Sequence, residues 1–132
     1  MNITSDALLT DLYELTMAQA YLAQGMTDIA VFEFFVRKLP PQRNFFMAAG
    51  LEQVVSYLEE FQFSDADIAW LDQTGGFSPA SLNALRAMRF TGEVHAMPEG
   101  SLFFPHEPIL RITAPLPQAQ LVETRVMNLL NF

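Results

Sequence analysis

Hydrophobic positions near the start of the chain repeat at helical spacing. Within residues 8–25 (LLTDLYELTMAQAYLAQG), Leu8, Leu12, Leu15 and Leu22 fall on one face, which predicts an amphipathic helix. The leucine face is expected to pack against the rest of the protein. This much is typical of an ordinary surface helix.

Polar residues mark the ends and one edge of this helix. Thr10 is placed to cap its start, Asp11 to lie in its first turn, and Gly25 to end it in the left-handed conformation. Asp11, Tyr13 and Glu14 form a polar and aromatic row beside the leucine face, which packing alone does not require. A surface helix with one buried tyrosine also explains this row, so the pattern leaves its role open.

The next segment has the composition of a β-strand. Residues 28–39 (DIAVFEFFVRKL) are rich in β-branched and aromatic side chains and end at Pro40-Pro41. Aromatic residues occur on both faces of this segment, so we expect a central strand that is covered on both sides. Residues 43–50 are expected to form a loop or a short strand.

Helical and extended segments divide the remaining chain. Hydrophobic spacing, with Ser64 and Ser78 as caps, predicts helices over residues 50–61, 64–74, 78–88 and 116–132. Alternating apolar residues and proline-containing turns predict strands over residues 90–96, 101–104 and 108–113. Together these elements predict an α+β fold.

The final helix ends without a stop signal. Its last residues, Leu129 to Phe132, continue the apolar pattern, with no polar tail after them. We therefore expect a domain over residues 1–115, followed by a helix over 116–132 that leads toward a domain missing from this chain. A helix end that is buried in a dimer is the alternative.

Composition narrows the class of protein. A length of 132 residues fits one domain, and 51% hydrophobic residues with 12 Phe suggest a large core or an apolar surface for a partner. The net charge of −8 argues against nucleic acid and anionic membranes as partners. The N-terminus lacks the pattern of a signal peptide, no stretch is long enough to span a membrane, and cysteine is absent, so we expect a cytoplasmic protein.

Residues that could carry chemistry are few. Arg37, Lys38 and Arg43 are three of the seven basic residues, and such a cluster suits a small anion such as a phosphate or simply the solvated end of a strand. His95 and His106 lack the spacing of metal ligands, and no carboxylates are paired for acid–base catalysis. The residues alone therefore predict neither a catalytic residue nor a metal site in this chain.

A series of short motifs in order along the chain is similar to a known family. The motifs are Leu9-Thr10-Asp11-Leu12-Tyr13-Glu14-Leu15-Thr16-Met17, Val31-Phe32-Glu33, Arg37-Lys38-Leu39-Pro40, Ala49-Gly50-Leu51-Glu52, Phe90-Thr91-Gly92-Glu93-Val94, Pro98-Glu99-Gly100, Phe104-Pro105, Glu107-Pro108-Ile109-Leu110 and Gln120-Leu121-Val122-Glu123-Thr124. Each motif is weak alone, but together they cover nearly the whole chain. On this basis the chain resembles the N-terminal part of the nicotinate phosphoribosyltransferases.

The resemblance implies a fold and an activity. It implies an N-terminal α/β sandwich with a hammerhead-like strand region, in which helices pack on a mixed or antiparallel sheet, followed by a type II phosphoribosyltransferase barrel. It also implies an NAD-salvage enzyme that joins nicotinate to 5-phosphoribosyl-1-diphosphate, giving nicotinate mononucleotide and diphosphate with ATP hydrolysis. The full-length enzyme is expected to use ATP and Mg²⁺ and to form a head-to-tail homodimer.

The resemblance also implies roles for particular residues. Tyr13 would stack on the nicotinate ring of the neighbouring subunit, and Asp11 would orient the surroundings of that ring. Arg37, and less directly Lys38, would hold phosphate groups, which brings the basic cluster into the same shared site.

The family's phosphorylated histidine lies in the barrel, and neither His95 nor His106 matches it. The 132-residue chain alone is therefore expected to be inactive. Two other functions stay open: a non-catalytic dimerisation or interaction module that associates through the apolar strip of residues 116–132, and a related transferase that uses nicotinamide or quinolinate.

Overall fold

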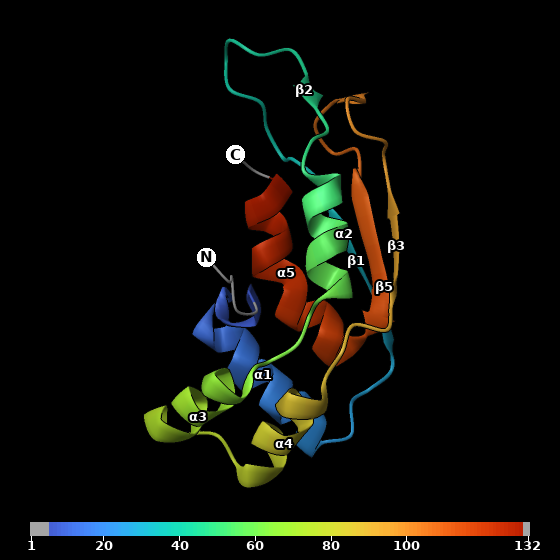
Figure 1. Ribbon diagram of the computed structural model, residues 1–132. Coiled ribbons are helices and arrows are strands. Elements are labelled where there is room, and N and C mark those ends of the chain that lie inside the picture. Colours follow the sequence, from blue (N-terminus) through green and yellow to red (C-terminus); the bar gives the residue numbers. More distant parts are fainter. Residues whose placement is uncertain (1–5, 131–132) are drawn as a thin grey trace.

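The structure is a computed structural model that describes residues 6–130. Figure 1 shows an elongated molecule in which helices lie beside a small twisted sheet. The helices are η1 (Asp6–Leu8), α1 (Leu12–Ala23), α2 (Leu51–Glu59), α3 (Asp65–Thr74), α4 (Pro79–Ala87) and α5 (Leu116–Leu130). The strands are β1 (Ile29–Phe34), β2 (Phe46–Met47), β3 (Glu93–Ala96), β4 (Leu102–Phe103) and β5 (Leu110–Pro115). This antiparallel α+β arrangement confirms the predicted fold class.

The main sheet is antiparallel, in the order β1-β5-β3. β5 lies at its centre and pairs with both neighbours, so that Thr113 is opposite Val31 on one side and Glu93 on the other. Side chains of β5 alternate between buried and more exposed positions, because helices cover one face of the sheet. A separate short ribbon pairs β2 with β4 at one end of the molecule.

The prediction that residues 28–39 form a central, doubly covered strand is wrong. β1 is an edge strand, and the side chains of Ile29 and Val31 are 66% and 57% exposed. Only its alternate residues, among them Phe32 and Phe34, pack against the core. A strand with apolar residues on both faces looks central in sequence. The true central strand contains Arg111, whose guanidinium pairs with Glu33 on the open face.

The core lies where α5 meets the other elements. α5 packs against α1, α2, β1 and β5. The apolar residues of α5 face inward: Leu121, Val122 and Val126 are buried, and Leu129 and Leu130 pack against the same core. Asn131 and Phe132, the predicted end of this helix, lie outside the described residues.

Most helix boundaries follow their predicted signals. Ser64 caps α3 in a reciprocal capping box with Asp67, and Ser78 caps α4 with Pro79 in its first turn. Gly25 has φ +66°, and the N–H of Met26 donates to the carbonyl of Tyr21, as in a Schellman ending. Local chemistry therefore fixes these boundaries.

The start of α1 differs from its prediction. Thr10 is not the cap: Asp11 is the N-cap residue and its side chain makes no capping hydrogen bond, because both side chains have partners elsewhere. Only part of the predicted leucine face packs against the core, since Leu15 is buried but the side chain of Leu12 is 67% exposed. The buried residues of α1 are Glu14, Leu15 and Ala18, so the inward face includes a carboxyl group.

Candidate functional site

A buried carboxyl group joins the first helix to the last. The Glu14 side chain is fully buried, and its Oε1 accepts hydrogen bonds from the backbone N–H of Thr124 at 3.2 Å and from the Thr124 hydroxyl at 2.9 Å. The Thr10 hydroxyl hydrogen-bonds to Glu14 Oε2. The Thr124 hydroxyl also lies 3.0 Å from Asp11 Oδ2. We call Thr10, Asp11, Glu14 and Thr124 the Glu14 clasp.

Burial changes the protonation of Glu14. It is the main cause that raises the pKa of this carboxyl group to about 7, and the negative charges of Glu123 and Asp11 raise it further. The hydrogen bonds from Thr124 lower this pKa but do not cancel the effect of burial. Glu14 therefore changes its charge near neutral pH, which is uncommon for a glutamate.

Tyr13 and Asp11 lie on the solvent side of the clasp. The Tyr13 ring is 47% exposed, and its hydroxyl lies 3.4 Å from Glu14 Oε1. Partial burial, followed by the charges of Glu123, Glu14 and Asp11, raises the pKa of the Tyr13 phenol, so this ring stays neutral. A neutral, exposed aromatic ring that is held through its hydroxyl is suited to stack on another flat ring.

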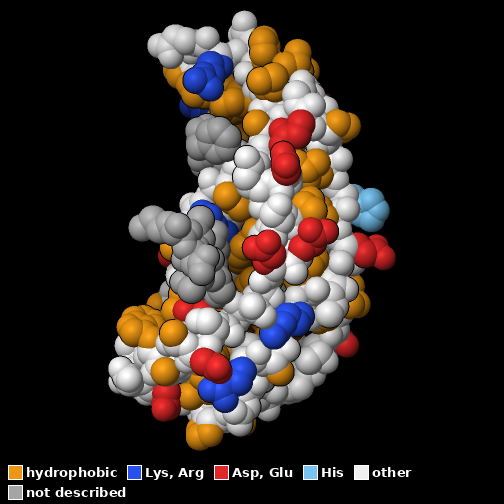
Figure 2. Space-filling view, viewed as in Figure 1, with side chains coloured by type: hydrophobic (Ala, Val, Ile, Leu, Met, Phe, Trp, Pro, Cys, Tyr) orange, Lys and Arg blue, Asp and Glu red, His pale blue; other side chains and the backbone are white. Residues whose placement is uncertain are grey.

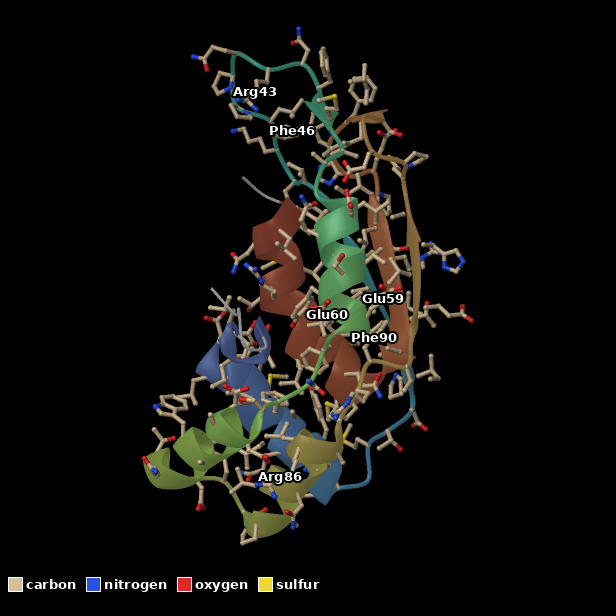
Figure 3. The ribbon with its side chains drawn as sticks, viewed as in Figure 1. Arg43, Phe46, Glu59, Glu60, Arg86 and Phe90 are labelled. Carbon is tan, nitrogen blue, oxygen red and sulfur yellow. The ribbon has the colours of Figure 1, made fainter. Side chains whose placement is uncertain are left out.

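The predicted basic residues lie elsewhere in the molecule. Arg37 and Lys38 are exposed in the loop after β1, and Figure 1 shows this loop at the β2 end of the molecule, away from α1. Arg43 lies in the same loop, with its guanidinium carbon 5.7 Å from the centre of the Phe46 ring (Figure 3). Within one chain, the structure therefore does not bring Arg37 and Lys38 next to Tyr13 and Asp11.

The loop between β1 and β2, which carries Arg37, Lys38 and Arg43 and which we call the basic loop, borders an open cavity. An open cavity of about 520 Å³ is lined by Gln42, Arg43, Phe46 and Leu130, among others. Figure 2 shows basic side chains at this end of the molecule and acidic ones over its middle. On this face, the basic side chains of the loop are thus separate from the acidic side chains over the middle.

Two of the family-like motifs meet and have a structural role. Glu99, from the motif Pro98-Glu99-Gly100, places its Oε1 3.0 Å from the N–H of Gly50 and 2.7 Å from the N–H of Leu51. These groups belong to the first turn of α2, where unpaired N–H groups favour a negative charge. The motif Ala49-Gly50-Leu51-Glu52 thus forms a helix start that is capped by a residue distant in sequence.

The remaining candidates show no catalytic arrangement. His95 is exposed on β3, and His106 is exposed in a turn with φ +68°. Within residues 6–130, no three His, Cys, Asp or Glu side chains lie close enough to hold a metal ion. No described helix has the length and apolar character needed to cross a membrane.

The sequence carried only partial signals for Glu14 and Thr124: both belong to family-like motifs, but no role was predicted for either residue. Glu14 was part of the polar row beside the leucine face, but nothing in its spacing separated it from the exposed Asp11 and Tyr13. Its position beside Leu15 and Ala18 on the inward face becomes evident only after the helix is docked on α5.

Comparison with known proteins decides the family. The model of the nicotinate phosphoribosyltransferase (NAPRTase) N-terminal domain matches residues 8–131. The chain belongs to the nicotinate phosphoribosyltransferase family. The predicted resemblance is therefore confirmed.

Relatives of this family match the chain closely over its length. A nicotinate phosphoribosyltransferase of Mycobacterium tuberculosis, pncB2, is 55% identical over 122 residues, which is 92% of this chain and 26% of the relative. The crystal structure of human nicotinic acid phosphoribosyltransferase has a TM-score of 0.83 and 41% identity, over 92% of this chain and 25% of that one. The chain thus spans about a quarter of the length of these nicotinate phosphoribosyltransferases.

A more distant structure shares the fold alone. Nicotinate-nucleotide pyrophosphorylase from Pyrococcus furiosus is 20% identical, with a TM-score of 0.70 over 98% of this chain and 27% of that one. The α+β arrangement is therefore not restricted to close relatives of nicotinate phosphoribosyltransferase, and it does not by itself identify a substrate.

Proposed function

We propose that this chain is the N-terminal part of an enzyme that makes nicotinate mononucleotide from nicotinate and 5-phosphoribosyl-1-diphosphate. The observation that carries this proposal is the family match over residues 8–131, supported by 55% identity to the Mycobacterium tuberculosis relative. In the reaction, the pyridine nitrogen bonds to the anomeric carbon of the ribose as the bond from that carbon to the diphosphate oxygen breaks. Positive charge develops on the ribose and the ring as diphosphate leaves.

Tyr13 and Asp11 are proposed to form this chain's part of the nicotinate site. The Tyr13 ring is exposed on one side and anchored near Glu14 on the other, which suits stacking on the pyridine. The carboxylates of Asp11 and Glu123 make the region negative, and after burial, which is the main cause, they raise the pKa of the Tyr13 phenol. A fixed negative charge favours the positive charge that develops in the transition state.

Arg37 and Lys38 are proposed to bind phosphate groups of 5-phosphoribosyl-1-diphosphate or ATP. Both are exposed, and both lie in the basic loop at the opposite end of the molecule from α1. In a head-to-tail homodimer, the basic loop of one chain and the α1 region of another can serve the same active site, so the separation within one chain favours two subunits per site. A guanidinium binds phosphate through two parallel hydrogen bonds.

Other parts of the proposal concern the rest of the enzyme. ATP and Mg²⁺ are proposed for the full-length protein. Among the described residues, no three His, Cys, Asp or Glu side chains lie close enough to hold a metal ion. A domain boundary after residue 115, with residues 116–132 leading toward a barrel, stays a prediction. A cytoplasmic location also stays a prediction.

A chimera tests the proposed function. This chain would replace the matching quarter of the Mycobacterium tuberculosis relative, and formation of nicotinate mononucleotide would be measured for the chimera and its Tyr13→Ala variant. We expect an active chimera, and a loss of at least about tenfold in kcat/KM for nicotinate in the variant because the stacking partner is gone. Tyr21→Ala is the matched control, since Tyr21 lies on the same helix but makes no contact with the clasp that the structure records.

Two outcomes would contradict the proposal. A folded chimera that forms no nicotinate mononucleotide would reject the function, and equal losses in both tyrosine variants would reject the role of Tyr13. Competition among nicotinate, nicotinamide and quinolinate would identify the preferred pyridine. A non-catalytic dimerisation module is disfavoured because Leu121, Val122 and Val126 of the apolar strip are buried within the chain's own core.

A further inference from the structure

The hydrogen bonds around Glu14 need more protons than the hydroxyl groups supply. Thr10 and Thr124 each carry one hydroxyl proton. The Thr10 hydroxyl contacts Glu14 Oε2 and lies 3.4 Å from the carbonyl oxygen of Leu121. The Thr124 hydroxyl lies 2.9 Å from Glu14 Oε1 and 3.0 Å from Asp11 Oδ2. The Tyr13 hydroxyl, at 3.4 Å, brings its own proton to Oε1. If Glu14 is a carboxylate, the two threonine protons must serve four contacts, so two of these contacts have no proton.

A proton on Glu14 supplies one of the missing donors. A protonated Oε2 donates to the Thr10 hydroxyl oxygen, and Thr10 then donates to the carbonyl of Leu121. Glu14 Oε1 still accepts from the backbone N–H of Thr124 at 3.2 Å. The Thr124 hydroxyl can then donate to Asp11, because a hydrogen bond to a carboxylate is stronger than one to a neutral acid.

We propose that Glu14 is a positioning residue whose protonated carboxyl group fixes Asp11 and Tyr13 at the nicotinate site. This inference rests on the proposed function, which assigns Asp11 and Tyr13 to that site. Glu14 is fully buried whereas Asp11 and Tyr13 are exposed, so Glu14 acts through its neighbours and does not touch the substrate. Its link to α5 is direct, because Oε1 accepts from the backbone N–H of Thr124, and the Thr124 hydroxyl is left to hold Asp11.

The surroundings of Glu14 make its ionisation disruptive. The titratable groups that face it are Asp11 before α1, Tyr13 on α1 and Glu123 on α5. Arg125 on α5 is engaged in an interaction of its own, and Arg86, the charged residue of α4, pairs with Asp65.

An ionised Glu14 would add negative charge beside Asp11 and Glu123 and compete for the Thr124 hydroxyl proton. Asp11 would then share the Thr124 hydroxyl proton with Glu14 and lose its fixed hydrogen bond.

The test measures kcat/KM for nicotinate as a function of pH in the chimera and in its Glu14→Gln variant. Glutamine keeps the shape of the protonated acid and cannot ionise. We divide kcat/KM for nicotinate in the unsubstituted chimera by its value in the Glu14→Gln variant. This ratio should fall by about fivefold between pH 6 and pH 8.5, because only the glutamate loses its proton. The change should appear in KM for nicotinate more than in KM for 5-phosphoribosyl-1-diphosphate. Glu59→Gln, which removes an exposed carboxylate from α2, should give a ratio that is constant with pH.

The Thr124 hydroxyl supplies a second pair of variants. Thr124→Ser keeps the hydroxyl and is expected to retain most of the activity with nicotinate, whereas Thr124→Val removes it and should raise KM for nicotinate by about five- to tenfold. In an active chimera, two results would overturn the inference. One is a ratio of kcat/KM values for Glu14→Gln that does not vary with pH, and the other is a KM for nicotinate in Thr124→Ser that is as high as in Thr124→Val. A folded but inactive chimera would instead reject the proposed function itself.

Discussion

Glu14 and Glu99 are two glutamates that join distant segments in opposite electrostatic settings. Glu99 is exposed, and its carboxylate meets consecutive N–H groups at the start of α2, where the helix dipole favours a negative charge. Glu14 is fully buried and lies among Asp11 and Glu123, so its surroundings oppose a negative charge. The comparison shows that the partners of a carboxyl group decide whether its surroundings favour or oppose a negative charge.

Gly50→Ala is expected to have the largest effect, since it disrupts the helix start that Glu99 caps. Gly50 has φ +97°, and a Cβ on it would lie 2.3 Å from the carbonyl oxygen of Leu129. Strain and this close approach together should destabilise the chain by about 3 kcal/mol, measured by denaturant unfolding. Gly100→Ala is the matched control: its φ is +82° but its Cβ would meet nothing within 4 Å, so it should cost about 1 kcal/mol. Equal losses would mean that the contact with Leu129 is unimportant.

Glu14→Gln should change the pH dependence of stability. The pKa of Glu14 is raised from 4.5 to about 7 in the folded chain, so the folded state binds a proton that the unfolded state has lost between these pH values. The resulting stability is fully present below pH 4.5 and is lost as the pH rises through about 7. Relative to the Gln variant, the unsubstituted chain should lose up to about 3 kcal/mol between pH 4.5 and pH 8.

Thermal or denaturant unfolding of both chains across this range checks the prediction for Glu14. Glu59→Gln, at an exposed position on α2, should leave the slope of stability against pH unchanged between pH 5 and pH 8. If the Glu14 variant shows the same slope as the unsubstituted chain, then Glu14 does not bind a proton on folding, and the comparison with Glu99 fails.

Glu99→Ala should have a smaller effect that does not depend on pH in the neutral range. It removes the acceptor for the N–H groups of Gly50 and Leu51, which costs about 1 kcal/mol for a helix cap. Glu99→Gln keeps an acceptor oxygen but loses the charge at the helix start, so about half of that loss is expected. Hydrogen exchange of the first turn of α2 would show the opening directly, and unchanged exchange in both variants would exclude the capping role.

The sequence predicted the elements whose signals are local. Ser64, Ser78 and Gly25 mark helix ends through contacts with residues only a few positions away, so the chain itself carries the information. The order of the family-like motifs likewise identified the family from the sequence, as the match over residues 8–131 confirms. Tyr13 and Asp11 were selected through that resemblance, and their substrate roles stay predictions.

Features that depend on docking were not available from the sequence. Three features depend on how segments pair across more than 70 positions. They are the face of β1 that is open to solvent, the burial of Glu14 against Thr124, and the distance between α1 and the Arg37 loop. Thr10 and Asp11 have strong local preferences for capping, but hydrogen bonds to Glu14 and Thr124 replace them. Local chemistry thus determined the helix ends at Ser64, Ser78 and Gly25. Tertiary packing decided which carboxyl group is buried, because burial depends on partners distant in sequence.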